Sequence, residues 1–327
     1  IAVDAATPAG REVVRRIAAR CDVVIENFRP GVMERLGLGY DDLRRGRDDL
    51  IYASLTGFGP DGPYAGKSAY DTVIQAYGGF AANQADPETG EPKFLNQTAA
   101  DKVTALVAAQ AITAALFARE RGAGGQHVEL SMLDAVVSFL WADAAGNELL
   151  LASDCSRPSS FVANFRPFRF TDGWGIATPT SDADFAGMCR ALGVEGYDDP
   201  RVATIAQRNQ HRELTREIMA RVYAVAATMT TADAMQRMER ERVPCGVVLT
   251  PAELADDPHA RAIGLLVDDV HPTAGPIRQP RHPTRFSATP ASLGGPAPLL
   301  GEHTDAVLAE LGLAVHVASL RAQGVVT

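Results

Sequence analysis

Cysteine is scarce in this chain, with only four among its 327 residues. Cys21, Cys155, Cys189 and Cys245 include no Cys-x-x-Cys pair, and their spacing fits neither a zinc site nor a disulfide framework. Such usage is typical of a reducing compartment, so we expect a cytoplasmic protein. The first residues also lack the basic and apolar segments of a secretory signal peptide.

Long apolar runs and an excess of positive charge are also missing. No uninterrupted apolar run reaches the roughly 18 residues that a membrane helix needs, so we expect no membrane span. The net charge of −9 argues against nucleic-acid binding, which needs a basic surface. An anionic small ligand remains compatible with this charge, because a local arginine cluster can bind one on an acidic protein.

Several common catalytic motifs are absent from the sequence. It has no P-loop, no Gly-x-Gly-x-x-Gly between a strand and a helix, no Gly-x-Ser-x-Gly and no His-Glu-x-x-His. The seven histidines show no metal-ligand spacing, so we expect no metal site. Candidate functional residues must therefore come from other patterns.

The first half of the chain alternates between helices and strands, which predicts an α/β fold with a doubly wound sheet. Thr7 as N-cap and Pro8 at the first helical position mark a typical helix start. Two apolar runs predict buried parallel strands. In chain order we expect a helix at 7–20, a strand at 22–28, short helices at 32–36 and 40–45, a strand at 50–55, and helices at 70–77 and 99–121.

The second half begins with a candidate linker, residues 153–166, rich in Ser, Arg and Pro. Asp172 and Gly173 lie in the middle of an expected hairpin. Beyond the linker we expect this hairpin at 168–177, helices at 185–192 and 212–226, a strand at 243–249, an extended segment at 266–285 and a C-terminal helix.

Asp101 follows Thr98 by three positions, directly before a long apolar run. One interpretation is a capping box, in which Thr98 is the N-cap and Asp101 complements the helix dipole. The other interpretation is functional: the helix N-terminus keeps the carboxylate ionised, and free N–H groups beside it stabilise an oxyanion. Such a carboxylate can act as a covalent nucleophile. Spacing alone leaves both interpretations open.

Two further groups of residues are candidates for a ligand site. Asn27, Phe28 and Arg29 follow the C-terminal end of an expected parallel strand, where α/β sheets bind ligands, although an ordinary loop is the alternative. Arg29 and Arg35 carry planar guanidinium groups that suit phosphate. Tyr70, next to Asp71, follows a loop dense in Gly and Pro, and a helix start with a buried tyrosine is the alternative there.

At these residues the chain resembles the family III CoA-transferases, which also include the α-methylacyl-CoA racemases. The resemblance spans nearly the whole chain and is specific as a set, whereas each stretch alone would be weak. The matching stretches, in family order, are VVIENFRPGVMERLGLGYDDL, LIYASLTGFGPDGPYAGKSAYD, AADKVTALVAAQAITAALFARERGAGGQHVELSMLDAV and PAPLLGEHTDAVLAELG.

The resemblance implies a Rossmann-like large domain, a smaller α+β middle domain, and two chains interlocked as a homodimer. It places the large domain at 1–152, the linker at 153–166, the small domain at 167–257 and the return to the large domain at 258–327. Family members carry an additional N-terminal segment, with a strand, a helix and further CoA contacts. This sequence begins after it, so a truncated, inactive homologue is an alternative.

The resemblance also implies an activity. An Asp at the position of Asp101 is the nucleophile that moves CoA from an acyl-CoA donor to a small carboxylic acid acceptor, through an aspartyl-CoA thioester. CoA is then a substrate, and no permanently bound cofactor is expected. The positions that line the family's CoA site match Asn27, Phe28, Arg29, Arg35, Ser68, Ala69, Tyr70 and Asp71.

Tyr70 separates the two activities of the family. The racemases carry a histidine there, and a racemase needs a proton carrier on each face of the α-carbon. A phenol, which in water keeps its proton up to about pH 10, is a poor replacement. The sequence therefore favours the transferase, with a racemase or isomerase that uses Asp101 as acid and base as the alternative.

Overall fold

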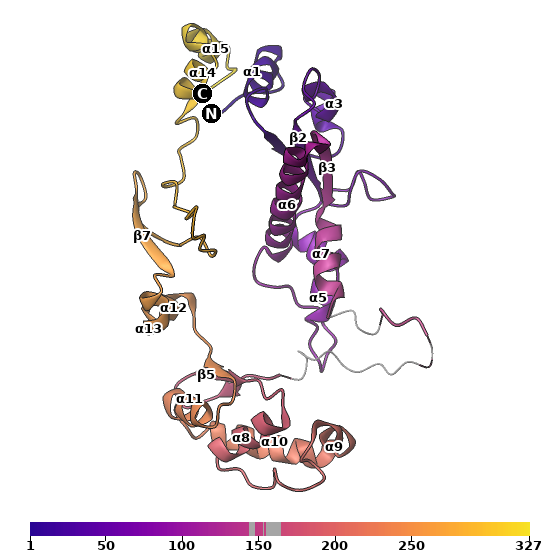
Figure 1. Cartoon of the computed structure of the whole chain (residues 1–327), viewed down its shortest axis with the longest axis vertical. Coiled ribbons are helices and arrows are strands. Elements are labelled where there is room, and N and C mark those ends of the chain that lie inside the picture. The colour runs from indigo at the N-terminus through magenta and orange to yellow at the C-terminus, as the bar shows by residue number, and fades with distance from the viewer. Residues whose placement is uncertain (144–147, 153, 155–164) are drawn as a thin grey trace. The chain divides into compact units, whose positions relative to one another are not determined.

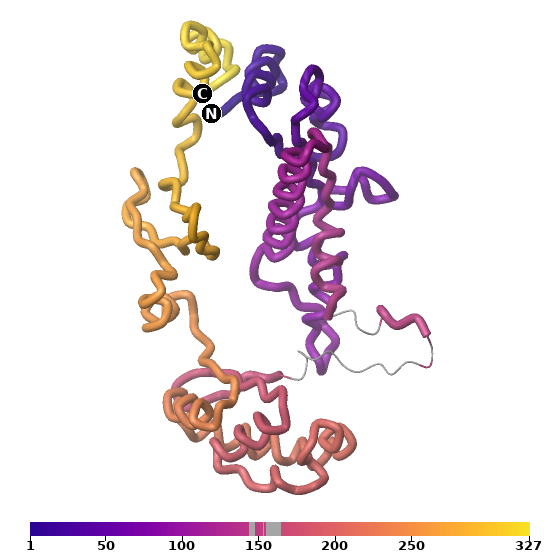
Figure 2. The backbone as a smooth tube through the Cα atoms, viewed as in Figure 1, coloured from indigo at the N-terminus to yellow at the C-terminus, as the bar shows by residue number. Residues whose placement is uncertain are grey.

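The computed structural model describes residues 1–143, 148–152, 154 and 165–327 (Figure 1). Its contacts group the chain into two compact units. The first combines Ile1–Pro158 with Ala297–Thr327, and the second is Ser159–Pro296. Both termini thus belong to the first unit, and Figure 2 marks them close to each other. The expected linker falls mostly outside the described residues, and the expected domain boundaries stay predictions.

A parallel sheet forms the centre of the first unit. Its strands run in the order β1 (Val23–Glu26), β2 (Ile51–Thr56) and β3 (Gln126–Ser131). Val23 lies opposite Ile51, which in turn lies opposite Gln126. The first residues of β2 are fully buried: the strand is paired along both edges, and α6 (Ala99–Ala118) packs on the sheet. The parallel sheet with its helices confirms the expected α/β class.

The helices of the first unit agree with the expected order along the chain. Thr7 caps the first of them by accepting the N–H of Gly10, with Pro8 at the first position as expected. Near the chain ends Val3 bridges to Val326. The helices are α1 (Pro8–Ala18), α2 (Val32–Arg35), α3 (Tyr40–Leu43), α4 (Asp71–Tyr77), α5 (Phe80–Asn83), α6 (Ala99–Ala118), α7 (Met132–Trp141), α14 (Thr304–Glu310) and α15 (Val317–Ala322).

Helix α6 packs on the sheet through its small residues. It contacts β2, β3, α4 and α7, and its buried positions include Ala100, Thr104 and Ala108 (Figure 1). Larger apolar side chains point the other way, since Leu106 and Phe117 are both 68% exposed. Small side chains on the packed face let the helix approach the strands closely, which places its N-terminal turn beside the strand ends.

The segment Ala99–Ala123 is also long and apolar enough to cross a membrane, judged by length and composition alone. No other helix in the described ranges meets that criterion. A mostly buried core helix of a globular protein meets it too; α6 does contact the sheet, but only 22% of its most apolar window is buried. The expectation that the chain has no membrane partner stays a prediction.

The second unit has its own small antiparallel sheet and a set of helices. The expected hairpin is confirmed, with Phe168 opposite Gly175, and Asp172 at its turn accepts the N–H of Thr231. The strands are β4 (Phe168–Arg169), β5 (Trp174–Ala177) and β6 (Cys245–Val247), with a separate β7 (Leu266–His271) and β8 (Gly275–Pro280) pair. The helices are α8 (Asp182–Ala191), α9 (Ile205–Gln210), α10 (Arg212–Ala226), α11 (Thr231–Arg240), α12 (Pro251–Asp256) and α13 (Pro258–Ala262).

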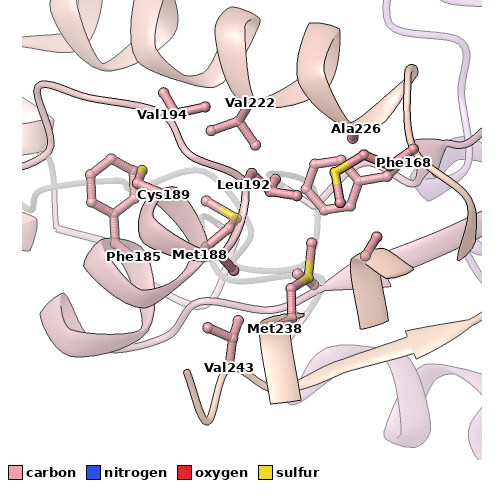
Figure 3. Packing of buried hydrophobic residues seen from close by; sticks show 14 of the residues in the cluster. Phe168, Phe185, Met188, Cys189, Leu192, Val194, Val222, Ala226, Met238 and Val243 are labelled. Atoms are coloured by element: carbon pink, nitrogen blue, oxygen red, sulfur yellow. The ribbon is translucent and has the colours of Figure 1, made fainter. Parts of the chain in front are cut away.

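The core of the second unit lies between its sheet and helices α8, α10 and α11. Phe168, Met188, Val222 and Met238 come from four different elements and are essentially inaccessible to solvent (Figure 3). Their burial supplies the hydrophobic stabilisation that lets this unit form a core of its own.

Candidate active site

A pocket of about 680 Å³ opens in the first unit where β1 and β2 end. The carboxyl ends of parallel strands meet at one edge of a sheet, which is where α/β proteins hold ligands. The first two turns of α6, through Asp101 and Thr104, and the start of α7, through Met132, complete its wall. Among the site residues expected from the sequence, those that line the pocket are Asn27, Phe28, Arg29, Ser68, Ala69, Tyr70 and Asp101.

Arg35 and Asp71 do not line this pocket. Arg35 is exposed at the end of α2. Asp71 is the first residue of α4 and only 7% exposed, so its carboxylate faces the protein interior rather than the pocket. Contact of these two residues with CoA stays a prediction that the geometry of the pocket does not support.

Asp71 instead belongs to a buried polar network beneath the first turn of α6. Its Oδ2 accepts the backbone N–H of Asp101 at 3.1 Å, and its Oδ1 accepts a hydrogen bond from Gln75 Nε2. The fully buried Gln75 also donates to the carbonyl of Gln97 at 2.9 Å and accepts the N–H of Leu95 at 3.0 Å. Helix α4 thereby holds the segment that leads into α6, at Leu95 and Gln97, and also the backbone of Asp101, the residue expected to be the nucleophile.

The start of α6 differs from both interpretations based on its spacing. Thr98 is the N-cap residue, but its side chain accepts no capping hydrogen bond, because Asp71 accepts from Asp101 instead. Two of the N–H groups expected to be free have acceptors, so the expectation is wrong for them: the N–H of Ala99 donates to the Gln97 carbonyl, and that of Asp101 donates to Asp71. The N–H of Lys102 makes the first regular helical bond, to the Thr98 carbonyl.

The electrostatics of Asp101 also depart from the expectation. Partial burial raises the pKa of this carboxyl above its ordinary value, and the negative charge of Asp71 raises it further. A helix N-terminus favours the ionised form, yet desolvation and a like charge outweigh that effect here. Asp101 remains exposed to the pocket, so an incoming electrophile can reach it.

The mouth of the pocket carries exposed side chains from two loops. Tyr70 is 80% exposed at the N-cap of α4, so the alternative of a buried tyrosine is wrong. Phe28 is 53% exposed at the end of β1. Arg29 is exposed beside it and forms no ion pair with any residue that the structure describes. A ring and an unpaired guanidinium at one opening can contact a base and a phosphate of a nucleotide-like ligand.

Lys67 is a pocket residue that the sequence argument missed. Its Nζ lies 4.5 Å from the ring centroid of Tyr77, 4.9 Å from that of Tyr64 and 5.9 Å from that of Phe58. It also donates a hydrogen bond to the Tyr77 hydroxyl. Aromatic faces attract a cation and limit its motion, so this ammonium group is held at the pocket. The aromatic residues around the loop were the available sign, but their convergence depends on the folded loop.

Gly57 lets the 65–70 segment lie against the end of β2. A Cβ added at Gly57 would lie 2.5 Å from the Cβ of Ala69, closer than side chains approach one another. The carbonyl of Gly57 also accepts the N–H of Leu133 at 3.1 Å, which ties the same loop to α7. The close approach of Ala69 requires a residue without a side chain at position 57.

A family model described as CoA-transferase family III matches residues 1–304 of the chain. The chain belongs to CoA-transferase family III. It is 35% identical over 315 residues to a succinate–glutarate CoA-transferase of Agrobacterium fabrum, covering 95% of this chain and 78% of that protein. It is 31% identical over 343 residues to a formyl-CoA:oxalate CoA-transferase of Rhodopseudomonas palustris, strain HaA2, covering 95% of this chain and 78% of that protein.

Solved structures agree with the family. A CAIB/BAIF family protein from Brucella suis matches with a TM-score of 0.79 and 33% identity, over 94% of this chain and 80% of that one. The protein Rv3272 from M. tuberculosis matches with a TM-score of 0.77 and 30% identity, over 94% of this chain and 82% of that one. The expected family, the transferase class and the general reaction, CoA transfer between an acyl-CoA and a carboxylic acid, are confirmed.

Proposed function

We propose that Asp101 is the covalent nucleophile of this CoA-transferase. The main support for the proposal is that Asp101, Arg29 and Tyr70, which are distant in the sequence, line the same pocket. Asp101 is exposed there. A carboxylate can attack a thioester when it is ionised and held in place. The Asp71 hydrogen bond supports the second condition, because it fixes the backbone of Asp101.

The proposed reaction is a ping-pong exchange in which every step is an acyl transfer. The Asp101 carboxylate attacks the thioester carbonyl of the donor and expels CoA thiolate, leaving a mixed anhydride. The thiolate attacks the aspartyl carbonyl, releases the donor acid and leaves an aspartyl-CoA thioester. The acceptor carboxylate attacks this thioester, and a second anhydride forms as CoA thiolate leaves. The thiolate then attacks the acceptor carbonyl, which yields the new acyl-CoA and restores Asp101.

The remaining pocket residues are proposed to hold CoA. Arg29 and Lys67 supply two cations for its phosphates, and the exposed ring of Phe28 supplies a surface for its base. No cluster of three metal-ligating side chains occurs among the residues described. Formation of a homodimer and a cytoplasmic location remain parts of the proposal that rest on the family resemblance and on the cysteine usage.

An exchange assay tests the proposed function. The full chain is mixed with succinyl-CoA and glutarate, because the Agrobacterium fabrum relative is named for succinate and glutarate, and new acyl-CoA is followed by mass spectrometry. We expect exchange by the wild type, loss to background in Asp101→Asn, and normal exchange in Asp41→Asn, a control at an exposed acidic residue outside the pocket. Exchange retained in Asp101→Asn contradicts the proposal.

The same assay in deuterated water separates transfer from racemase chemistry. A transferase moves CoA without touching the α-carbon, so its acyl product carries no solvent deuterium. A racemase removes and replaces the α-proton, and deuterium enters. Deuterium incorporation that depends on Asp101, without acyl exchange, would show that the alternative is correct.

A further inference from the structure

The second unit holds a cavity of about 710 Å³ that shares no lining residue with the Asp101 pocket. Its apolar lining includes the exposed Ile205 of α9, next to the closed core of Phe168, Phe185 and Met188 that Figure 3 shows. One face of α10 forms a wall through Met219 and Tyr223. A concave apolar space of this size falls within the range of small-molecule pockets.

The charged lining of this cavity has one sign. Arg166, Arg208, Arg212 and Arg216 line it, and none of the described lining residues is an aspartate or a glutamate. In a chain whose net charge is −9, such a cluster is notable. Arg212 and Arg216 lie one helical turn apart on one face of α10, and Met219 lies on the same face in the next turn. The wall therefore changes from cationic to apolar along the helix.

Most of this positive charge is not compensated by the protein. Arg208 is compensated, because its Nη2 lies 2.6 Å from Asp182 Oδ1 and its guanidinium lies over the Phe185 ring. Arg212 donates only to the backbone carbonyl of Asn209 at 3.2 Å. Neither Arg212 nor Arg216 has a carboxylate within ion-pair distance among the residues described.

We propose that this cavity binds a fatty acid, an amphipathic monocarboxylate. The carboxylate would pair with Arg212 and Arg216, whose planar groups suit two-point contact with it. The hydrocarbon chain would lie along the half-buried Met219 and Tyr223 and the exposed Ile205. The charge of the arginine pair favours an anion, and the accessible apolar side chains of Ile205, Met219 and Tyr223 favour a chain over a small polar acid. This site goes beyond the proposed transferase function and does not depend on it.

Calorimetric titration of the full chain with dodecanoate, below its aggregation concentration, tests this proposal. We expect saturable one-to-one binding to the wild type. Arg212→Gln with Arg216→Gln should weaken it about 10- to 100-fold, the usual range for charge-assisted contacts. Arg201→Gln is the matched control, because Arg201 is an exposed arginine of the same unit that pairs with Asp199 outside the cavity. It should change affinity less than about twofold.

A second variant and two ligand controls complete the test. Ala220→Glu places a carboxylate in the cavity wall and should also reduce affinity about tenfold or more, with an unchanged melting curve showing that the unit folds. Dodecan-1-ol lacks the charge and acetate lacks the chain, so both should bind at least about tenfold more weakly than dodecanoate.

The proposal also requires that Arg29→Gln keeps full dodecanoate affinity, since Arg29 lines only the other pocket. Absence of saturable binding, equal affinity in the double arginine variant, or loss of binding in Arg29→Gln would each overturn the proposal. Because this titration requires no acyl exchange, its failure is distinguishable from failure of the transferase proposal.

Discussion

Asp71 Oδ2 accepts the backbone N–H of Asp101 at 3.1 Å, and this bond joins the start of α4 to the first turn of α6. One buried carboxylate therefore fixes the position of another that faces the pocket. The same proximity has an electrostatic effect, since the charge of Asp71 contributes to the raised pKa of Asp101. Asp71 is thus a positioning residue in the proposed mechanism rather than a ligand contact.

Asp71→Asn should alter both effects. Removing the negative charge lowers the pKa of Asp101. Because the nucleophile must be ionised, the acidic limb of the plot of kcat against pH should move to lower pH. The amide has one oxygen and can retain only one of the two hydrogen bonds, so kcat should also fall about tenfold. Gln75→Leu is the control, because it disrupts the network without changing charge. It should lower kcat without shifting the limb, and an equal shift in both variants would contradict this account.

Asp101→Asn should affect stability in a pH-dependent manner. A carboxyl whose pKa is raised by folding contributes stability that is fully present below its unfolded pKa and lost as pH rises through the folded pKa. The asparagine variant cannot ionise and avoids that loss. Urea unfolding should therefore show the variant gaining stability relative to the wild type as pH rises from about 3 to neutral. A relative loss over that range would disagree with the raised pKa.

Arg29→Gln should weaken CoA binding by about 10- to 100-fold, because an unpaired guanidinium at the pocket mouth would lose a charge-assisted contact to phosphate. The fold should be unaffected, since the side chain is exposed. Titration with CoA measures the effect. Arg45→Gln is the matched control, at a surface arginine that pairs with Asp42 outside the pocket. Equal affinities in the two variants would show that Arg29 does not contact CoA.

Gly57→Ala should displace the 65–70 segment, because the new Cβ would meet the Cβ of Ala69 at 2.5 Å. We expect a loss of about 1–3 kcal/mol in unfolding free energy, typical of overpacking, and about tenfold lower activity. Ala69→Gly in the same chain removes the clash and should restore most of both losses. Gly66→Ala, with open space around its Cβ position, is the control. A double variant no better than Gly57→Ala would argue against this contact.

Local patterns in the sequence predicted the helices and strands well, but they did not predict the network of side-chain contacts. The Thr7–Pro8 start of α1 and the Asp172 turn are short-range features, so spacing alone located them. The face that α6 packs against the sheet could not be predicted, because apolar residues lie all around that helix and the packed ones are small. Propensity describes a segment alone, whereas close approach depends on its neighbours.

The pocket was predicted in part, through residues next to strand and helix ends. The Asp71–Asp101 bond joins positions 30 residues apart, and neither residue type nor spacing distinguishes a buried acceptor from a ligand contact. Lys67 was missed for a similar reason, because three aromatic rings converge on it only in the folded loop. Contacts of this kind follow from tertiary structure rather than from local sequence.

The central claim, that Asp101 becomes covalently linked to CoA, is tested most directly by trapping. The full chain is incubated with acyl-CoA in the absence of acceptor acid, treated with hydroxylamine, digested and mapped by mass spectrometry. Hydroxylamine attacks the aspartyl carbonyl of the thioester, expels CoA thiolate and leaves a hydroxamate. The account predicts a hydroxamate at Asp101 that requires acyl-CoA and is missing in Asp101→Asn. A hydroxamate at another carboxylate, or none while the same preparation exchanges acyl groups, would contradict it.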